Sequence, residues 1–161
     1  MYSTMPAEIH DDQHYMQAAL EEARLAADDD EIPVGAVITL GGSIIARAHN
    51  ENRSKNDPTK HAEITAIREA ARFLGNERLT DCVLYVTKEP CAMCAGAIVH
   101  ARIKRLVIGA RDVRYGACGT ALSVCGNGVL NHVPCIEFGL MEEESSGLLK
   151  EFFRKKRKEK I

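Results

Sequence analysis

Two short apolar runs on either side of a helix-like segment constrain the fold of this 161-residue chain more than any other feature. Residues 82–87 and 103–109 have the composition of buried strands, and residues 91–101 between them have the composition of a helix. A strand, a helix and a second strand in this order imply that the two strands pair in parallel, joined by a right-handed crossover. The pattern therefore predicts an α/β fold.

The other segments can be placed around this unit in one sheet. Residues 33–40 and 43–48 are β-type runs on either side of Gly41-Gly42, which predicts a hairpin. Further helices are expected over 14–28, 59–73 and 145–158, with Pro58 at the start of the second, and a last strand over 135–140. Residues 111–132 are rich in glycine and receive no assignment. The sum predicts a three-layer α/β/α sandwich with one mixed five-stranded sheet, forming a single domain over residues 1–161.

Composition narrows the class of protein and its compartment. No apolar segment is long enough to span a bilayer, and residues 1–12 lack the apolar run of a signal peptide. The six cysteines lie between residues 82 and 135. In a chain of this kind a close cysteine pair is more often metal-binding or redox-active than structural. We therefore expect a cytoplasmic protein with no membrane contact.

The net charge of −2 hides a strong asymmetry between the body of the chain and its end. Residues 154–160 hold six basic side chains and one acidic side chain, so the rest of the chain is acidic. A basic helix over about 145–160 is consistent with contact to a polyanion. It is equally consistent with a solvated helix end, where cations suit the helix dipole.

Two fragments contain the residues of a catalytic site, His61-Ala62-Glu63 and Pro90-Cys91-Ala92-Met93-Cys94. A C-x-x-C pair alone is a weak signal, since it also occurs in structural zinc sites and in thioredoxin-like redox proteins. Together the fragments offer one imidazole and two thiolates, all near predicted helix starts, where thiolates are stabilised. Three protein ligands leave a fourth zinc position for water, as in catalytic sites.

Glu63 follows His61 by two residues, so it can reach that water as a free carboxylate and accept and return its proton. The combination H-x-E with P-C-x-x-C is the known signature of zinc-dependent nucleobase deaminases. The sequence therefore predicts a hydrolytic deaminase with Glu63 as proton carrier and with His61, Cys91 and Cys94 as zinc ligands.

Further segments point to one family. They are Pro33 to Val37, Asp57 to Ile64, Glu89 to Ala97, Gly109 to Asp112, Gly116 to Thr120, Leu130 to His132 and Phe152 to Arg154. Through them, from about residue 14 to residue 158, the chain resembles the bacterial tRNA-specific adenosine deaminases of the cytidine deaminase-like superfamily. The resemblance implies conversion of adenosine to inosine at the wobble position of a tRNA anticodon. It also implies one zinc ion per subunit, no organic cofactor, and a homodimer that binds the anticodon stem-loop.

The same resemblance implies roles for residues outside the zinc site. Asn50 and Ala62 correspond to positions that contact the target nucleoside. Arg111 and Asp112 correspond to a segment that lines the RNA-binding groove, and Phe153 and Arg154 to a C-terminal helix near the anticodon loop. Lys88 departs from the family, which usually has a large apolar residue there. This position abuts the site, so one alternative is that Lys88 alters substrate contacts near the pocket; we favour the other, in which its side chain points into solvent.

Three other functions remain open from the sequence. A deaminase of free guanine or cytosine bases or nucleosides would share the zinc chemistry but would not need the basic helix. A noncatalytic, zinc-stabilised RNA-binding module would not need Glu63. A thiol–disulfide redox protein would need Cys91 and Cys94 free of metal.

Overall fold

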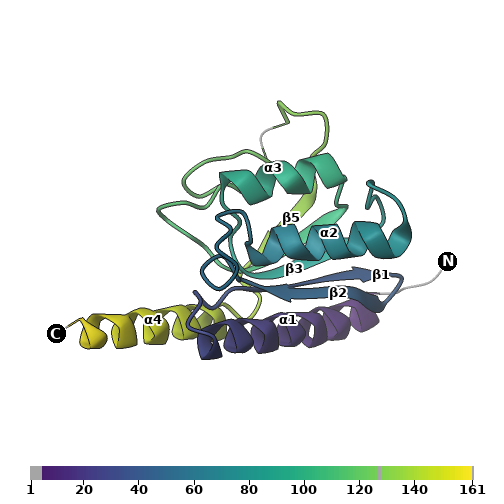
Figure 1. The fold of residues 1–161 in the computed structure, drawn as a ribbon. Helices are drawn as coiled ribbons and strands as arrows, with labels where there is room; N and C mark the ends of the chain where they lie inside the picture. Colours follow the sequence, from purple (N-terminus) through teal and green to yellow (C-terminus); the bar gives the residue numbers. More distant parts are fainter. Residues whose placement is uncertain (1–4, 127, 161) are drawn as a thin grey trace.

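The computed structural model describes residues 5–126 and 128–160, with side chains from residue 12 on, and it has three layers (Figure 1). Helices α1 (Met5–Asp28) and α4 (Glu142–Glu159) cover one face of a five-stranded sheet. Helices α2 (Ala62–Leu74) and α3 (Ala92–Ala101) cover the other face. This arrangement confirms the predicted α/β/α sandwich.

The sheet is mixed and has the strand order β2-β1-β3-β4-β5. Strands β1 (Gly35–Leu40) and β2 (Ser43–His49) form the predicted antiparallel hairpin. Its turn residues Gly41 and Gly42 have φ of 57° and 82°, which is why glycine is needed at both. Strand β1 is antiparallel to β3 (Val83–Lys88), and β3, β4 (Arg105–Ala110) and β5 (Cys135–Phe138) run parallel.

Two strand glycines let the helices of one face approach the sheet closely. A Cβ atom on Gly35 would lie 1.9 Å from the carbonyl oxygen of Ala19 in α1. A Cβ atom on Gly109 would lie 2.5 Å from Oγ of Ser145 in α4. No larger residue fits at either position without moving a helix away from the sheet.

Helix α2 begins three residues later than the apolar spacing predicts, and the reason is a hydrogen-bonded turn. The carboxylate of Asp57 accepts bonds from the N–H and the hydroxyl of Thr59, at 2.9 and 2.7 Å. Pro58 stands in this turn and not at the first helical position, which corrects the prediction. The turn leaves His61 as the N-cap residue, with extended backbone at φ −77° and ψ 153°.

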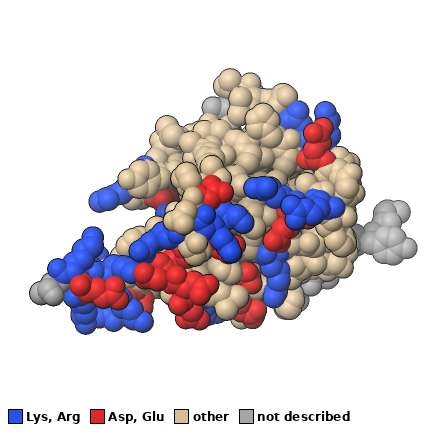
Figure 2. Space-filling model, viewed as in Figure 1, with Lys and Arg blue, Asp and Glu red and all other residues tan. Residues whose placement is uncertain are grey.

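The two helices of the other layer, in contrast, begin earlier than predicted. Helix α1 starts at Met5 and α4 at Glu142, in segments that are mostly polar and so give no apolar periodicity. The first turn of α4 is acidic, which suits the positive end of the helix dipole. Figure 2 shows Lys and Arg side chains gathered over the C-terminal half of this helix. In the described part of the chain, no helix is long and apolar enough to cross a membrane.

Candidate active site

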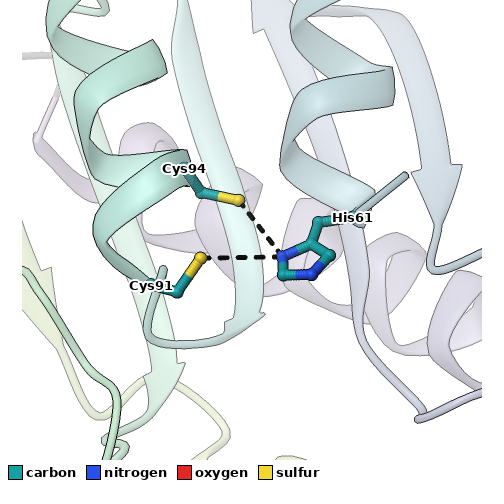
Figure 3. Close-up of side chains that lie close together, drawn as sticks. All are labelled: His61, Cys91 and Cys94. Atoms are coloured by element: carbon teal, nitrogen blue, oxygen red, sulfur yellow. Dashed lines mark hydrogen bonds between the residues drawn. The ribbon is translucent and has the colours of Figure 1, made fainter. Parts of the chain in front are cut away.

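The three predicted metal ligands lie together where two helices begin (Figure 3). His61 is the N-cap of α2, Cys91 is the N-cap of α3, and Cys94 lies in the first turn of α3. The Nδ1 atom of His61 is 3.6 Å from Sγ of Cys91 and 3.5 Å from Sγ of Cys94. One donor atom from each residue lies within 4.8 Å of the other two, so the group can hold one metal ion. An imidazole with two sulfur ligands is a donor set that zinc accepts.

Hydrogen bonds among these three side chains shift their pKa values in ways that matter for binding a cation. The bond from the Cys94 thiol, helped by His61 and opposed by burial, lowers the pKa of Cys91 to about 3. The same bond raises the pKa of Cys94, and a hydrogen bond to Cys91 raises the pKa of His61. The lowered pKa favours the thiolate form of Cys91, with the remaining protons on Cys94 and His61. A metal ion takes the place of such protons when it binds.

Glu63 stands in the first turn of α2, one residue beyond the N-terminal Ala62. Its side chain lies on the wall of the same cavity as His61 and Cys91, and the residue is only 4% exposed. Burial raises the pKa of this carboxyl group. A buried carboxyl group beside a metal site is the arrangement of a group that accepts and donates a proton.

The cavity has a volume of about 290 Å³, close to the lower end of the range for small-molecule sites. Its wall combines two apolar side chains with polar and charged ones from several loops. The lining residues are Ile32, Val34, Asn50, Asn52, His61, Glu63, Lys88, Glu89, Cys91, Asp112 and Tyr115. Five of these residues, Asn50, His61, Glu63, Cys91 and Asp112, are predicted from the sequence for the site or its surroundings, whereas the side chain of Lys88 is expected to point into solvent.

Asn50 is buried and connects the cavity to the start of α2. Its Oδ1 atom accepts a hydrogen bond of 2.9 Å from the backbone N–H of Ala62. The amide NH₂ group of Asn50 remains to meet a molecule in the cavity. The side chain of Ala62 is fully buried and does not line the cavity, so a substrate contact of Ala62 stays a prediction.

Lys88 points into the site, and the expectation that it faces solvent is wrong. Its Nζ atom lies 3.0 Å from Oδ2 of Asp112, and both side chains are largely buried. The strand geometry explains this placement. Lys88 is two residues after Val86, so it shares the sheet face on which Val86 packs in the main core.

The remaining residues of the resemblance lie in different surroundings. Asp112 lines the cavity, whereas the guanidinium of Arg111 stacks 3.8 Å from the ring centroid of Phe138. Phe153 is 41% exposed, and Arg154 is paired with Glu151 at 2.7 Å. The structure thus brings Asp112 to the cavity and places the other three outside it.

Glu89 organises the loop that closes one side of the cavity, and the sequence analysis gave it no role. Its carboxylate accepts hydrogen bonds from the N–H groups of Asp112, Cys118 and Thr120 and from the Thr120 hydroxyl. A Cβ atom on Gly116 would lie 2.4 Å from Cδ of Glu89. Glu89 and Gly116 each begin a segment that carries the family resemblance. Their contact could not be predicted, because a helix and a strand lie between them in the chain.

Known proteins with similar sequences agree on one activity. Residues 10–157 match the MafB19-like deaminase family. A tRNA-specific adenosine deaminase of Agrobacterium fabrum is 49% identical over 144 residues, which cover 89% of this chain and 95% of that protein. The corresponding enzyme of Bacillus subtilis is 44% identical, with 92% of each chain covered.

Solved structures share the fold, and one from a tRNA:A34 deaminase study is much more similar in sequence than a guanine deaminase. A structure from a study of A-to-I editing by tRNA:A34 deaminases superposes with a TM-score of 0.82 at 48% identity. That match covers 84% of this chain and 99% of the other. A guanine deaminase from Nitrosomonas europaea shares the fold with a TM-score of 0.76 but only 25% identity, over 87% of this chain and 83% of its own. The chain belongs to the family of tRNA-specific adenosine deaminases.

Proposed function

We propose that the protein hydrolyses adenosine to inosine at the wobble position of a tRNA anticodon. The observation that carries the proposal is the joint placement of His61, Cys91, Cys94 and the buried Glu63. The A-to-I editing of the similar solved structure and the names of the relatives support the choice of substrate. As part of the same proposal, the chain acts as one deaminase domain in the cytoplasm.

In this proposal one zinc ion would be held by Nδ1 of His61 and by the sulfur atoms of Cys91 and Cys94. Zinc bound there supplies Lewis acidity, which makes water a usable nucleophile near neutral pH. The two helix N-termini favour negative charge on the sulfur ligands.

Glu63 moves the protons of the reaction in this scheme. It accepts a proton from the attacking water as the new bond to C6 of the purine forms, and it delivers that proton to the ring nitrogen N1. It next takes the proton of the new C6 hydroxyl group and passes it to the amino group, so that the C6–N bond breaks, the C6 carbonyl forms and ammonia leaves. Water and adenosine thus give inosine and ammonia without any organic cofactor.

Substrate contacts follow from the residues on and near the cavity. The amide group of Asn50 would bind the nucleoside, and Asp112 would meet the part of the nucleotide that stays at the entrance. Ala62 and Arg111 are proposed as further contacts from the family resemblance. A single-stranded loop base can be turned out into such a pocket at modest cost, which suits an anticodon.

The basic end of α4 is proposed to bind the anticodon stem-loop beside the site. Phe153 lines a second hollow together with Arg114 from the loop after β4 and with four cations, Lys150, Lys156 and Arg157 of α4 and Lys160 just beyond its end. Cations on such a surface gain affinity by releasing the counterions of RNA phosphates. Arg154, adjacent to Phe153, is included in this proposed contact.

A homodimer is also part of the proposal, and helix α3 supports it. This helix contains no Lys, Arg, Asp or Glu, and its inner face is buried in the core. Its outer face still exposes Ala92 and Met93. Apart from the exposed His100 near its end, the helix is apolar on all sides. Such a helix is normally buried, so a second subunit is the natural cover. Light scattering after size-exclusion chromatography would give the molecular mass.

The test is deamination of a tRNA that carries adenosine at the wobble position, read as inosine by nuclease digestion and mass spectrometry. We expect inosine from the unmutated protein and a loss of about 10²–10⁴-fold in Glu63→Gln, since that is the usual contribution of a proton-transferring side chain. Zinc content should be the same in both proteins. Glu69→Gln is the matched control, because Glu69 is an exposed glutamate of the same helix.

Guanine and cytidine are incubated in parallel. Turnover of guanine without inosine from tRNA would retain the chemistry and overturn the substrate assignment. Full activity of Glu63→Gln would overturn the role of Glu63 and favour a noncatalytic module.

A further inference from the structure

Tyr115 is an exposed aromatic residue at the entrance of the active-site cavity. It lines that cavity, yet 67% of its surface is exposed. Among the described residues of the lining it is the one Tyr, Phe or Trp. An aromatic ring with so little burial contributes little to the stability of the core. A role other than core packing is therefore needed to explain Tyr115 at the cavity entrance.

The backbone that carries Tyr115 is fixed although its ring is exposed. Oδ1 of Asp112 accepts hydrogen bonds from the N–H groups of Arg114 and Tyr115, both at 3.0 Å. The N–H of Gly116 donates to the carbonyl of Asp112, also at 3.0 Å. Lys88 pairs with the other oxygen of the Asp112 carboxylate. The ring is therefore presented on a rigid turn, which lowers the entropy lost when a partner binds it.

The position of the turn also matters. Tyr115 faces the cavity, while the neighbouring Arg114 lines the hollow formed with Phe153 and the cations of α4. An RNA strand with one base in the cavity and its phosphates along α4 must pass over this turn. The nucleotide next to the target is then the part of the strand nearest the ring.

We propose that Tyr115 stacks against a base directly adjacent to the target adenosine and so holds the anticodon loop open over the cavity. This inference rests on the proposed function, since it requires an RNA strand with one base inserted. Stacking on an aromatic side chain suits unpaired bases and tolerates any base identity, because every base has a π face. Tyr115 is thus a positioning residue for polynucleotide substrates and takes no part in the chemistry.

The first experiment measures deamination of an anticodon stem-loop RNA by metal-loaded Tyr115→Ala and Tyr115→Phe. Loss of one base stack should raise the KM of Tyr115→Ala about 5–150-fold, with kcat within about twofold of the unmutated value. Tyr115→Phe keeps the ring and should retain the unmutated KM. The matched control is Phe73→Ala, because Phe73 is 68% exposed and lies near the C-terminal end of α2, outside both hollows.

The second experiment detects the stack directly. A 5-iodopyrimidine is placed directly before or directly after the target in the RNA, and the complex with Glu63→Gln is irradiated. We expect one of the two RNAs to cross-link to Tyr115, identified by mass spectrometry, and the cross-link to disappear in the double variant with Tyr115→Ala.

The outcomes separate this inference from the function on which it rests. Absence of inosine from the unmutated protein would refute the proposed function itself. Normal editing with an unchanged KM in Tyr115→Ala, or a cross-link only to other residues, would refute the stacking role alone. A fall in kcat in Tyr115→Phe would also refute it, because the ring would then be acting through its hydroxyl group.

Discussion

At the scale of single residues, the contact between Lys88 and Asp112 ties the end of β3 to the loop that borders the cavity. Burial raises the pKa of Asp112, but hydrogen bonds from the Tyr115 N–H and from Lys88 outweigh it, so the net effect lowers the pKa. Both oxygens of the carboxylate are engaged inside the protein, one with Lys88 and the other with the turn. The positive charge of Lys88 is therefore already neutralised before RNA arrives.

Lys88→Met should loosen this loop and leave the number of contacts to RNA phosphates unchanged. We expect the KM for tRNA to rise about 3–10-fold, corresponding to roughly 1 kcal/mol for one partly exposed ion pair. The slope of log KM against log salt concentration should stay the same, because Lys88 contacts a carboxylate and not a phosphate. A slope smaller by about one would show that Lys88 binds a phosphate directly.

The proximity of His61, Cys91, Cys94 and Glu63 could be predicted, because these residues lie in two short segments whose spacing is visible in the chain. Contacts between segments that are far apart in the chain could not be predicted in this way. The Thr120 hydroxyl reaches Glu89 across 31 positions, and no local pattern reports such a pair. Lys88 could have been placed, since alternation along β3 puts it on the face of Val86. The expectation that the Lys88 side chain faces solvent did not take this alternation into account.

At the scale of elements, α4 divides its cations between the protein and the solvent. Lys156 pairs with Asp30 just after α1, and Arg154 pairs with Glu151 within the helix. In the described structure, no ion pair involves Lys150, Arg157 or Lys160, and all three line the hollow around Phe153. Lys155 and Lys158 are exposed and are also outside the ion pairs of the described residues, but only Lys150, Arg157 and Lys160 combine this freedom with a place in the hollow.

Replacing Lys150, Arg157 and Lys160 together by glutamine should weaken tRNA binding mainly at low salt. We expect the slope of log Kd against log salt concentration to fall by about two to three, with little change in thermal stability. The control replaces Arg72, Arg78 and Lys104, three exposed cations that lie outside this hollow. Equal loss of affinity in both triple variants would show that only net charge matters.

The existence of the helices and strands could be predicted from apolar periodicity, whereas the start of α2 could not. The start depends on the side chain of Asp57, whose bonds to Thr59 form a turn where the composition still favours a helix. The glycine-rich residues 111–132 received no assignment, because their structure rests on bonds to Glu89 and Asp112.

At the scale of the whole molecule, one charged cluster joins α1 to three strands of the sheet. The carboxylate of Asp12 accepts hydrogen bonds from Arg105 in β4 at 2.8 and 2.5 Å and from the hydroxyl of Tyr85 in β3 at 2.5 Å. Arg105 also binds Glu137 in β5. Burial raises the pKa of Asp12, but the bonds from Arg105 and Tyr85 together lower it below the usual value.

Asp12→Asn should therefore destabilise the protein in a manner that depends on pH. Since the folded-state pKa of Asp12 is below its unfolded value, the cluster stabilises the protein above about pH 4 and loses this effect as the pH falls through the folded pKa. We expect urea unfolding to show a deficit of about 2 kcal/mol at pH 7 that shrinks below pH 4. The exposed Asp81→Asn serves as control and should show no such trend. A deficit that stays constant down to pH 3 would contradict the assignment.

The placement of the predicted metal ligands at the starts of two separate helices has a consequence for the unfolded chain. His61 and Cys91 are 30 positions apart, and the segment between them includes α2 and β3. An ion held by both residues closes this segment into a ring, as a disulfide would. By the chain-entropy relation for a ring of this size, such a link lowers the conformational entropy of the unfolded state and so raises its free energy by about 3–4 kcal/mol. A metal ion bound at the active site would thereby also stabilise the folded state, as a cross-link does.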